Sequence, residues 1–270
     1  MGLRTSANTR ALDATCDQTY LDRDIVDEYA AASHLQKAEH AILDIIRDRL
    51  PGMTMLDVGV GGGRTTLHFA PLVRHYVGID LSEAMVAACR KRFANTLTNA
   101  RFEAADVRDL HAFADGTFDF VLFSFNGLDS VPGRDRLRAL EEIRRVGKPG
   151  ALFCFSAHNL QSLPHHFKLR NTVSFHPLRI LPTLRRWRRL RQANPGLRTR
   201  LREPHGMFFD GVHDLRLQQY YIRPAAQLQQ LEGRFETVAT FLRSGGQRVK
   251  DEHTLNTTTD AWIYYLCTMK

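Results

Sequence analysis

The stretch of residues 55–70, MLDVGVGGGRTTLHFA, decides the fold of this chain. It runs from apolar residues to Asp57, and four glycines follow within the next six residues. Glycine accepts positive φ angles and lets a ligand approach the backbone, because it has no Cβ atom. In open α/β sheets, ligands bind next to such turns at the carboxyl ends of the strands. The stretch therefore predicts a buried strand, a nucleotide-binding turn and a helix.

Outward from this stretch, strands and helices are predicted to alternate, which is typical of a parallel, doubly wound sheet. The strands are almost continuously apolar, as expected when helices cover both faces of the sheet. After residue 160 the alternation stops for about sixty residues, and it then resumes. The further predicted strands are 75–80, 100–110, 118–126, 151–159, 234–243 and 261–270. The predicted helices are 20–50 (one or two helices), 63–72, 82–94, 133–150 (ending in a Lys-Pro-Gly turn) and 223–233. Residues 244–260 are predicted to form a loop.

The glycine turn fits neither of two common phosphate-binding patterns. The dinucleotide fingerprint G-x-G-x-x-G, started at Gly59, places Arg64 at its third required glycine position, and a P-loop Gly-Lys-Ser/Thr is absent. Counted from Asp57, the pattern is instead D-x-G-x-G-x-G, with Gly61 and Gly63 at the later positions. An acid at a strand end is unfavourable for a pyrophosphate but suits an ammonium group. S-adenosylmethionine carries an amino group and a sulfonium and has no phosphate.

At this point the sequence resembles the class I S-adenosylmethionine-dependent methyltransferases. The resemblance implies that Asp57 faces the cofactor's amino group, directly or through water, and that Gly59, Gly61 and Gly63 shape the turn around it. It also implies that Asp80, 23 residues after Asp57, binds both ribose hydroxyls. It covers residues 53–160 and 221–270, but not the segment between them.

The same resemblance assigns the rest of the cofactor site. Leu81 and Met85 are implied as apolar contacts to the adenine. Asp106 would accept a hydrogen bond from the adenine amino group, and Val107 lies beside it, where a backbone donor to the ring is expected. The segment FSFNGLD, at the end of the fourth core strand, resembles the family's motif at the centre of the sheet. Two of its residues, Ser124 and Phe125, would line the methionine end of the cofactor.

The resemblance implies an α/β, doubly wound seven-stranded sheet, the Rossmann-like methyltransferase fold, with its last strand antiparallel beside the sixth. Residues 1–50 are expected to form an N-terminal tail and lid helices, with Tyr20, Tyr29 and His34 as lid candidates. The cofactor-binding core is expected at 51–160. A basic helical insertion or substrate lid is expected at 161–220, and residues 221–270 complete the sheet.

The candidates for catalysis at the ends of strands four and five are Asn126, Asp129, His158 and Asn159, and the first three are the assigned catalytic residues. Methyl transfer is an in-line displacement, and a general base is needed only for a protonated acceptor. His158 could accept that proton near neutrality, or be a loop histidine bonded to backbone. Asp129 could bind an acceptor amine or cap a helix. Asn126 could orient the substrate or the methionine carboxylate, or form the turn before Gly127.

The net charge of +8 is concentrated in one segment. Residues 160–216 hold twelve Lys or Arg against three acids, so the remainder is almost neutral. This segment could cover an anionic small molecule, or grip RNA or an acidic protein through the arginine-rich part 185–202, with Trp187 and Phe175 for stacking. It could also be an amphipathic helix whose arginines are solvated. That helix would bury Leu184, Trp187, Leu190 and Leu197, and the Asn-Pro-Gly at 194–196 would end it.

The sequence therefore predicts a methyltransferase acting on an O or N nucleophile of a small molecule, as in metabolite or natural-product modification. An RNA or protein methyltransferase is the alternative, and a non-catalytic cofactor-binding scaffold is the second. DNA methylation is disfavoured because strand four lacks the Asn-Pro-Pro-Tyr and Pro-Cys motifs. The four cysteines lack metal or disulfide spacing, and no apolar run is long enough to span a membrane. We expect a cytoplasmic protein without a metal or membrane partner.

Overall fold

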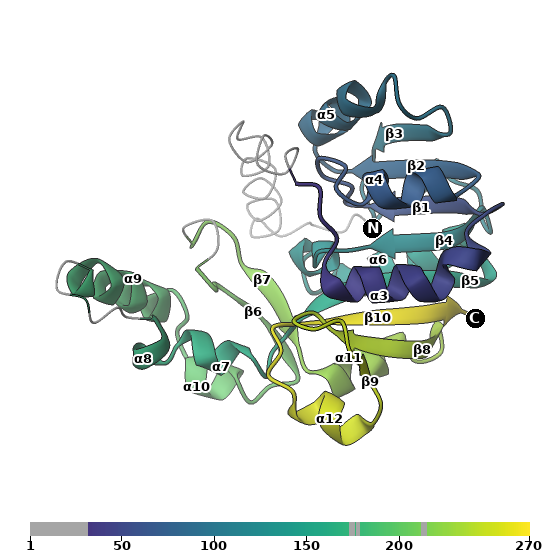
Figure 1. Ribbon diagram of the computed structural model, residues 1–270. Coiled ribbons are helices and arrows are strands. Elements are labelled where there is room, and N and C mark those ends of the chain that lie inside the picture. Colours follow the sequence, from purple (N-terminus) through teal and green to yellow (C-terminus); the bar gives the residue numbers. More distant parts are fainter. Residues whose placement is uncertain (1–31, 173–175, 177–178, 212–214) are drawn as a thin grey trace, which may run out of the picture.

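The computed structural model describes residues 32–172, 176, 179–211 and 215–270. Tyr20, Tyr29 and Phe175, named above, lie outside these residues. A ten-stranded sheet forms the centre of the molecule (Figure 1). Its main path runs in the order β3 (Ala100–Ala104), β2 (His75–Asp80), β1 (Thr54–Val58), β4 (Phe118–Phe123), β5 (Gly147–Asn159), β10 (Trp262–Met269), β8 (Phe235–Leu242) and β9 (Arg248–Val249).

The strands β1 to β5 are parallel, as the alternating pattern predicted. β1 pairs with β2 and β4, β2 pairs with β3, and β4 pairs with β5. The last strand, β10, lies between β5 and β8 and is antiparallel to both. The predicted doubly wound sheet with an antiparallel last strand is confirmed, but the sheet has ten strands instead of the predicted seven, because β6, β7 and β9 also pair into it. Because the five strands are parallel, their carboxyl ends meet at one edge.

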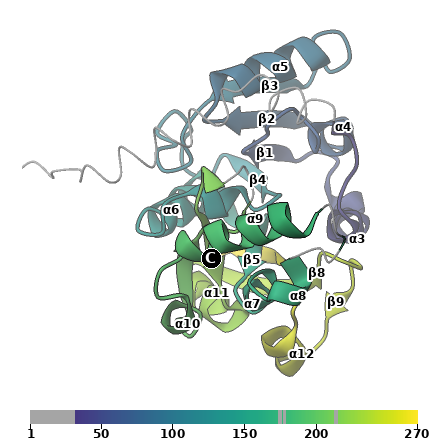
Figure 2. The ribbon, with the colours of Figure 1, turned by 90° about the vertical axis from the view of Figure 1, so that its left-hand side faces the viewer.

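Helices cover both faces of this sheet. Figure 2 shows α6 (Arg136–Val146) on one side of β1 and β4, and α3 (Lys37–Ile46) and α4 (Thr66–Phe69) on the other. Alternate residues of one strand accordingly enter different cores. Phe153 and Phe155 of β5 pack on the α6 side, whereas Cys154 packs on the α3 side. The remaining covering elements are α5 (Glu83–Phe93), α11 (Pro224–Leu231) and the short helices η1 (Arg47–Arg49), η2 (Ala70–Leu72) and η3 (Gly127–Ser130).

The helix expected at the end of the N-terminal lid, α3, is part of the core. Its buried residues Ile42, Leu43 and Ile46 join the apolar cluster that includes Phe120 of β4. The segment at 244–260, predicted as a loop, contains β9 and α12 (Glu252–Thr257). The predicted Lys-Pro-Gly turn at 148–150 is also part of a strand, because β5 begins at Gly147. Pairing partners decide these details: Gly147 lies beside Phe118 of β4, and β9 lies beside β8.

The insertion forms a small helical unit beyond the carboxyl ends of the parallel strands (Figure 1). A hairpin of β6 (His205–Phe208) and β7 (Gln219–Ile222) joins it to the sheet, because β7 pairs with His158 and Asn159 of β5. Its own apolar cluster includes Leu190 and Leu197. The predicted break at Asn-Pro-Gly is confirmed between α9 and α10. The helices are α7 (Leu163–His166), α8 (Leu169–Thr172), α9 (Ile180–Gln192) and α10 (Leu197–Arg200). No helix in the described ranges is both long and apolar enough to span a membrane.

Candidate cofactor and acceptor site

The glycine turn has the backbone that the D-x-G-x-G-x-G pattern requires. Gly59, Gly61 and Gly63 have φ angles of 63°, 53° and 81°, in the left-handed region where other residues are strained. A Cβ atom on Gly63 would also lie 2.4 Å from Cε2 of Phe93 on α5. The turn therefore needs glycine at these positions for conformation and, at Gly63, for close packing against α5.

Asp57 lies beneath this turn, at the end of β1. Its side chain is buried, and Oδ2 accepts hydrogen bonds from Thr65 Oγ1 and Tyr76 Oη, each at 2.5 Å. Burial raises the pKa of Asp57 to about 6, although both hydrogen bonds and the charge of Arg64 oppose the rise. The partners Thr65 and Tyr76 were not expected. They make Asp57 a support of the turn in addition to a candidate for the cofactor's amino group.

Asp80 connects the end of β2 to the glycine turn. Its Oδ2 accepts from the backbone N–H of Gly61 and its Oδ1 from that of Ser82, both at 2.9 Å. Burial raises the pKa of this carboxyl, and the two backbone donors oppose that rise. Next to it Leu81 is 49% exposed, whereas Met85 on the first turn of α5 is buried. Leu81 thus presents a free apolar face beside the predicted ribose partner.

Asp106 has a partner that the sequence did not indicate. The Arg108 guanidinium bonds to both of its oxygens, at 2.8 Å from Nε and 2.6 Å from Nη2 to Oδ2 and at 3.0 Å from Nε to Oδ1. Partial burial would raise the pKa of Asp106, but the hydrogen bonds from Arg108 outweigh it and lower the pKa. Val107, between them, is buried. A contact from Asp106 to adenine therefore requires Arg108 to share this carboxylate.

A buried ionic cluster lies at the predicted methionine end. Glu39 of α3 accepts from Arg64 Nη1 at 2.6 Å and Nη2 at 2.7 Å, and also from the hydroxyls of Ser124 and Tyr264. Glu39 is buried, and 13% of the Arg64 side chain is exposed. The sequence reasoning used Arg64 only to exclude a dinucleotide and did not consider Glu39, because contacts 25 residues apart leave no local pattern.

The chain is strained directly after β4. Phe125 and Asn126 both have positive φ angles, 56° and 59°, which non-glycine residues rarely adopt. Phe125 is 38% exposed and packs edge-on against Trp262 with ring centroids 4.9 Å apart. Asn126 is buried, and within the described part of the chain neither atom of its carboxamide has a hydrogen-bond partner. Such strain and unsatisfied polarity concentrate at functional sites.

His158, at the end of β5, is held by Asp129 of η3. Its Nδ1 lies 2.9 Å from Asp129 Oδ2, which also accepts its backbone N–H at 2.6 Å. The other Asp129 oxygen accepts from Arg136 Nη1 at 2.7 Å, and both of these side chains are completely buried. Since a carboxylate paired with arginine only accepts, the Nδ1 atom of His158 carries the proton. Both oxygens of the buried Asp129 side chain are thus occupied by His158 and Arg136, so Asp129 orients His158 and does not contact an acceptor itself.

Aromatic rings surround His158. Tyr221 of β7 lies 4.7 Å from it and Trp262 of β10 lies 5.8 Å from it, measured between ring centroids. The pairing of β5 with both strands brings these rings together, because His158 is opposite Tyr221 and opposite Trp262 in register. The side chain of His158 remains 11% exposed. The candidate base therefore packs against two aromatic rings, and a small part of its own ring is exposed to solvent.

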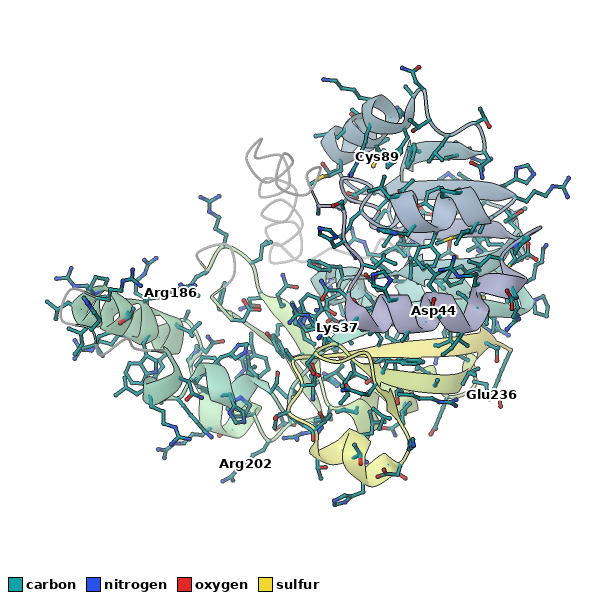
Figure 3. All side chains as sticks on the ribbon, viewed as in Figure 1. Lys37, Asp44, Cys89, Arg186, Arg202 and Glu236 are labelled. Carbon is teal, nitrogen blue, oxygen red and sulfur yellow. The ribbon has the colours of Figure 1, made fainter. Side chains whose placement is uncertain are left out.

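The insertion carries an exposed basic surface. Apart from the half-buried Arg200, every arginine from 179 to 202 is exposed, and none forms an ion pair with an acid in the described ranges. Figure 3 shows side chains projecting outward from this unit, among them Arg186 of α9 and Arg202, which follows α10. Leu190 is buried while Leu184 and Trp187 are half-buried, which fits the expected amphipathic helix.

The predicted residues gather at the carboxyl edge of β1, β2, β4 and β5 and in the loop after β3. Among the residues that the structure describes, no group of three or more His, Cys, Asp or Glu could hold a metal ion. Cys89, Cys154 and Cys267 are buried free thiols, and Cys16 lies outside the described ranges. The geometry therefore offers acidic, glycine-rich and aromatic groups for an organic ligand.

Comparisons with known proteins agree on one class. A family profile described as a methyltransferase domain matches residues 55–150. The ubiquinone biosynthesis O-methyltransferase of Xanthomonas campestris pv. campestris is 30% identical over 183 residues, covering 65% of this chain and 74% of that protein. The protein of the same name from Hahella chejuensis is 32% identical over 142 residues, covering 52% of this chain and only 58% of that protein.

A solved structure extends the likeness over the whole fold. The 1,6-didemethyltoxoflavin-N1-methyltransferase of Burkholderia thailandensis, with 1,6-didemethyltoxoflavin and S-adenosylhomocysteine bound, has a TM-score of 0.59 to this chain. The alignment covers 100% of this chain and 93% of that chain at 15% identity. At this level of identity the likeness establishes the fold.

Proposed function

The chain belongs to the class I S-adenosylmethionine-dependent methyltransferases, and from this we propose that it methylates an oxygen or nitrogen of a small molecule, with His158 as general base. The hydrogen bond of 2.9 Å between Asp129 and His158 Nδ1 is the observation that carries the proposal. It places the ring proton on Nδ1, so Nε2 is the basic atom. An acceptor hydroxyl or ammonium could lose its proton to that nitrogen.

The residues around the glycine turn fit S-adenosylmethionine, which supplies an electrophilic methyl group when bound. Thr65 and Tyr76 both donate to Oδ2 of Asp57, so Oδ1 would accept from the amino group. The Asp80 carboxylate, held by Gly61 and Ser82, would accept from the ribose hydroxyls. Leu81 would cover one face of the adenine, with Met85 and Val107 behind it. The turn offers no lysine for a phosphate, in agreement with this cofactor.

The acceptor pocket would be formed by aromatic rings and one amide. His158, Trp262 and Phe125 present ring surface, and the buried Tyr221 packs against His158, which favours a planar acceptor. The unpartnered carboxamide of Asn126 can both donate and accept, so it would bind a polar substituent beside the reacting atom. The names of the relatives also point to ring compounds, since one group acts in ubiquinone biosynthesis and one structure holds 1,6-didemethyltoxoflavin.

A turnover assay tests this proposal. Purified protein would be incubated with S-adenosylmethionine and a panel of phenols, hydroxylated heterocycles and ring amines, with methylated product and S-adenosylhomocysteine quantified by mass spectrometry. We expect product from at least one ring acceptor. Parallel reactions would contain RNA or protein in place of the ring compounds. Methylation of RNA or protein, with cofactor binding but no turnover of any ring compound, would contradict the small-molecule proposal.

The basic insertion supports a second candidate, a methyltransferase for an anionic or RNA acceptor. Its exposed arginines have no acidic partners in the described ranges, and they stand beyond the carboxyl edge where an acceptor would enter. Phosphate contacts by arginine release counterions, so binding of such an acceptor would weaken steeply with salt. A small neutral acceptor would not show this dependence.

A further inference from the structure

We propose that Arg64 binds the carboxylate of the cofactor's methionine moiety. This inference rests on the family's cofactor and is independent of the acceptor. The carboxylate is the cofactor's only anionic group, and none of the cofactor contacts proposed above is a positively charged partner for it. Arg64 follows Gly63 directly, and its guanidinium carbon lies 4.9 Å from the centroid of the Phe125 ring. It therefore stands between the glycine turn and the end of β4, where the methionine end is expected.

The hydrogen bonds of Arg64 leave one edge of its guanidinium available. A guanidinium has five N–H donors. Glu39 takes one from Nη1 and one from Nη2, and the carbonyl of His34 takes the second from Nη1 at 3.1 Å. Among the described residues, the Nε–H and the second hydrogen of Nη2 have no acceptor. These two donors point the same way, and such a pair binds a carboxylate in bidentate fashion.

The rest of the cluster holds that edge in place. Glu39 is itself fixed by Ser124, Tyr264 and the backbone N–H of Gln36, the last at 2.6 Å. The guanidinium also lies over the Phe125 ring, and this cation–π contact favours its position. A preorganised arginine loses little conformational entropy when it binds a planar anion. Arg64 is thus oriented before the ligand arrives, and its 13% exposed fraction gives the ligand access.

The charges around the turn match a zwitterion. Asp57 precedes the glycines and Arg64 follows them, and the positive charge of Arg64 acts on the Asp57 carboxyl, opposing the pKa rise caused by burial. The ammonium of an amino acid would approach the acid, and its carboxylate would approach the arginine. A ligand that lacks the carboxylate would not use Arg64, and this difference gives the test.

The experiment compares two ligands by calorimetry, S-adenosylhomocysteine and its decarboxylated analogue, which keeps the amino group. Because Arg64→Met alone would leave Glu39 charged and buried, the double variant Glu39→Gln/Arg64→Met is used with it. We expect the variants to bind S-adenosylhomocysteine about 10- to 100-fold more weakly than wild type, from the loss of a charge-assisted bond. Their affinity for the decarboxylated analogue should stay within about twofold of wild type.

Arg92→Met is the matched control. Arg92 donates to the carbonyls of Gly62, at 2.6 Å, and Ala32, at 3.4 Å, so it touches the same turn and the same N-terminal segment. It should weaken both ligands by the same factor. If the Arg64 variants also weaken both ligands equally, or keep the wild-type preference for the carboxylate, Arg64 only fastens α3 to the turn and the proposal is wrong. Thermal unfolding monitored by circular dichroism identifies any variant that fails to fold.

Discussion

At the scale of single residues, the environment of His158 decides what it can do. Its Nδ1 atom is committed to Asp129, and the charge of Asp129 is balanced by the buried Arg136. The exposed part of the ring adjoins Trp262 and Tyr221. The arrangement separates the functions of the two residues, since Asp129 orients and His158 would exchange a proton with the acceptor.

We expect His158→Gln to lower kcat by about 100- to 10,000-fold, the usual contribution of a general base. Affinity for S-adenosylhomocysteine should not change, because His158 is not among the proposed cofactor contacts. His205→Gln is the control, since His205 is an exposed histidine on β6 that stacks on Tyr220. Steady-state kinetics and calorimetry measure the two effects. Wild-type kcat in His158→Gln would rule out a general base at this position.

Asp57 gives a prediction for stability as a function of pH. Burial raises its pKa from 3.8 to about 6 in the folded state, so the folded protein binds the proton more tightly than the unfolded chain. The resulting stabilisation is complete below about pH 4 and disappears as the pH rises through about 6, a change on the order of 3 kcal/mol. Asp57→Asn removes this titration.

Urea unfolding at several pH values measures this effect. The unfolding free energy of wild type minus that of Asp57→Asn should fall by about 3 kcal/mol between pH 4 and pH 7. A difference that does not depend on pH would mean that Asp57 titrates normally in the folded protein. The same variant should bind S-adenosylhomocysteine more weakly, because the turn loses its charged support.

At the scale of elements, the glycine turn is joined to its neighbours on three sides. Asp80 of β2 binds the N–H of Gly61, Arg92 of α5 binds the carbonyl of Gly62, and Arg64 joins the turn to Glu39 of α3. The turn therefore depends on two helices and one strand for its shape.

Gly63→Ala tests the close packing between the turn and α5. We expect it to destabilise the protein by about 1–3 kcal/mol more than Gly233→Ala, which is the overpacking cost of an added methyl group. The two glycines have similar φ angles, 81° and 78°, but a Cβ at Gly233 meets no atom within 4 Å. Chemical denaturation of the two variants gives the difference. Equal losses would show that only the φ angle matters at Gly63.

At the scale of the whole molecule, the positive charge lies in the insertion and not in the sheet that would bind the cofactor. The sheet and its helices carry almost no net charge, whereas the insertion beyond the carboxyl edge carries the excess of arginine. We propose that the nearly neutral sheet and its helices bind the cofactor. Electrostatic attraction of an anionic acceptor would come from the arginines of the insertion.

We therefore expect a neutral ring acceptor to show the same kcat/KM in low and high salt, and in the variant Arg185→Gln/Arg188→Gln/Arg189→Gln. An anionic acceptor should lose kcat/KM with salt in wild type and much less in the variant. A linear fall of log affinity for RNA with log salt, with a slope of about −0.7 for each phosphate contact, would favour the RNA alternative. A neutral acceptor that loses turnover in the variant would contradict this division.

Local patterns in the sequence were sufficient for much of the fold. Apolar runs predicted β1, β2, β4 and β10, and the glycine spacing predicted the ligand-binding turn after β1. The acids Asp57 and Asp80 could be placed at one edge because parallel strands end together. Each of these features depends on residues close in sequence or on a rule about parallel sheets.

What the sequence alone determined is thus the class of sheet, the glycine turn, the family resemblance and the acids that end the strands. Only the tertiary structure decided which groups those acids meet: Tyr76 for Asp57, Arg108 for Asp106, and Arg136 with His158 for Asp129. It also decided that Glu39 holds Arg64, and that β7 brings Tyr221 beside His158. The physical reason is that a side chain's protonation and orientation depend on burial and on the partners that folding supplies. Most of those partners are distant in sequence and leave no periodic signal there.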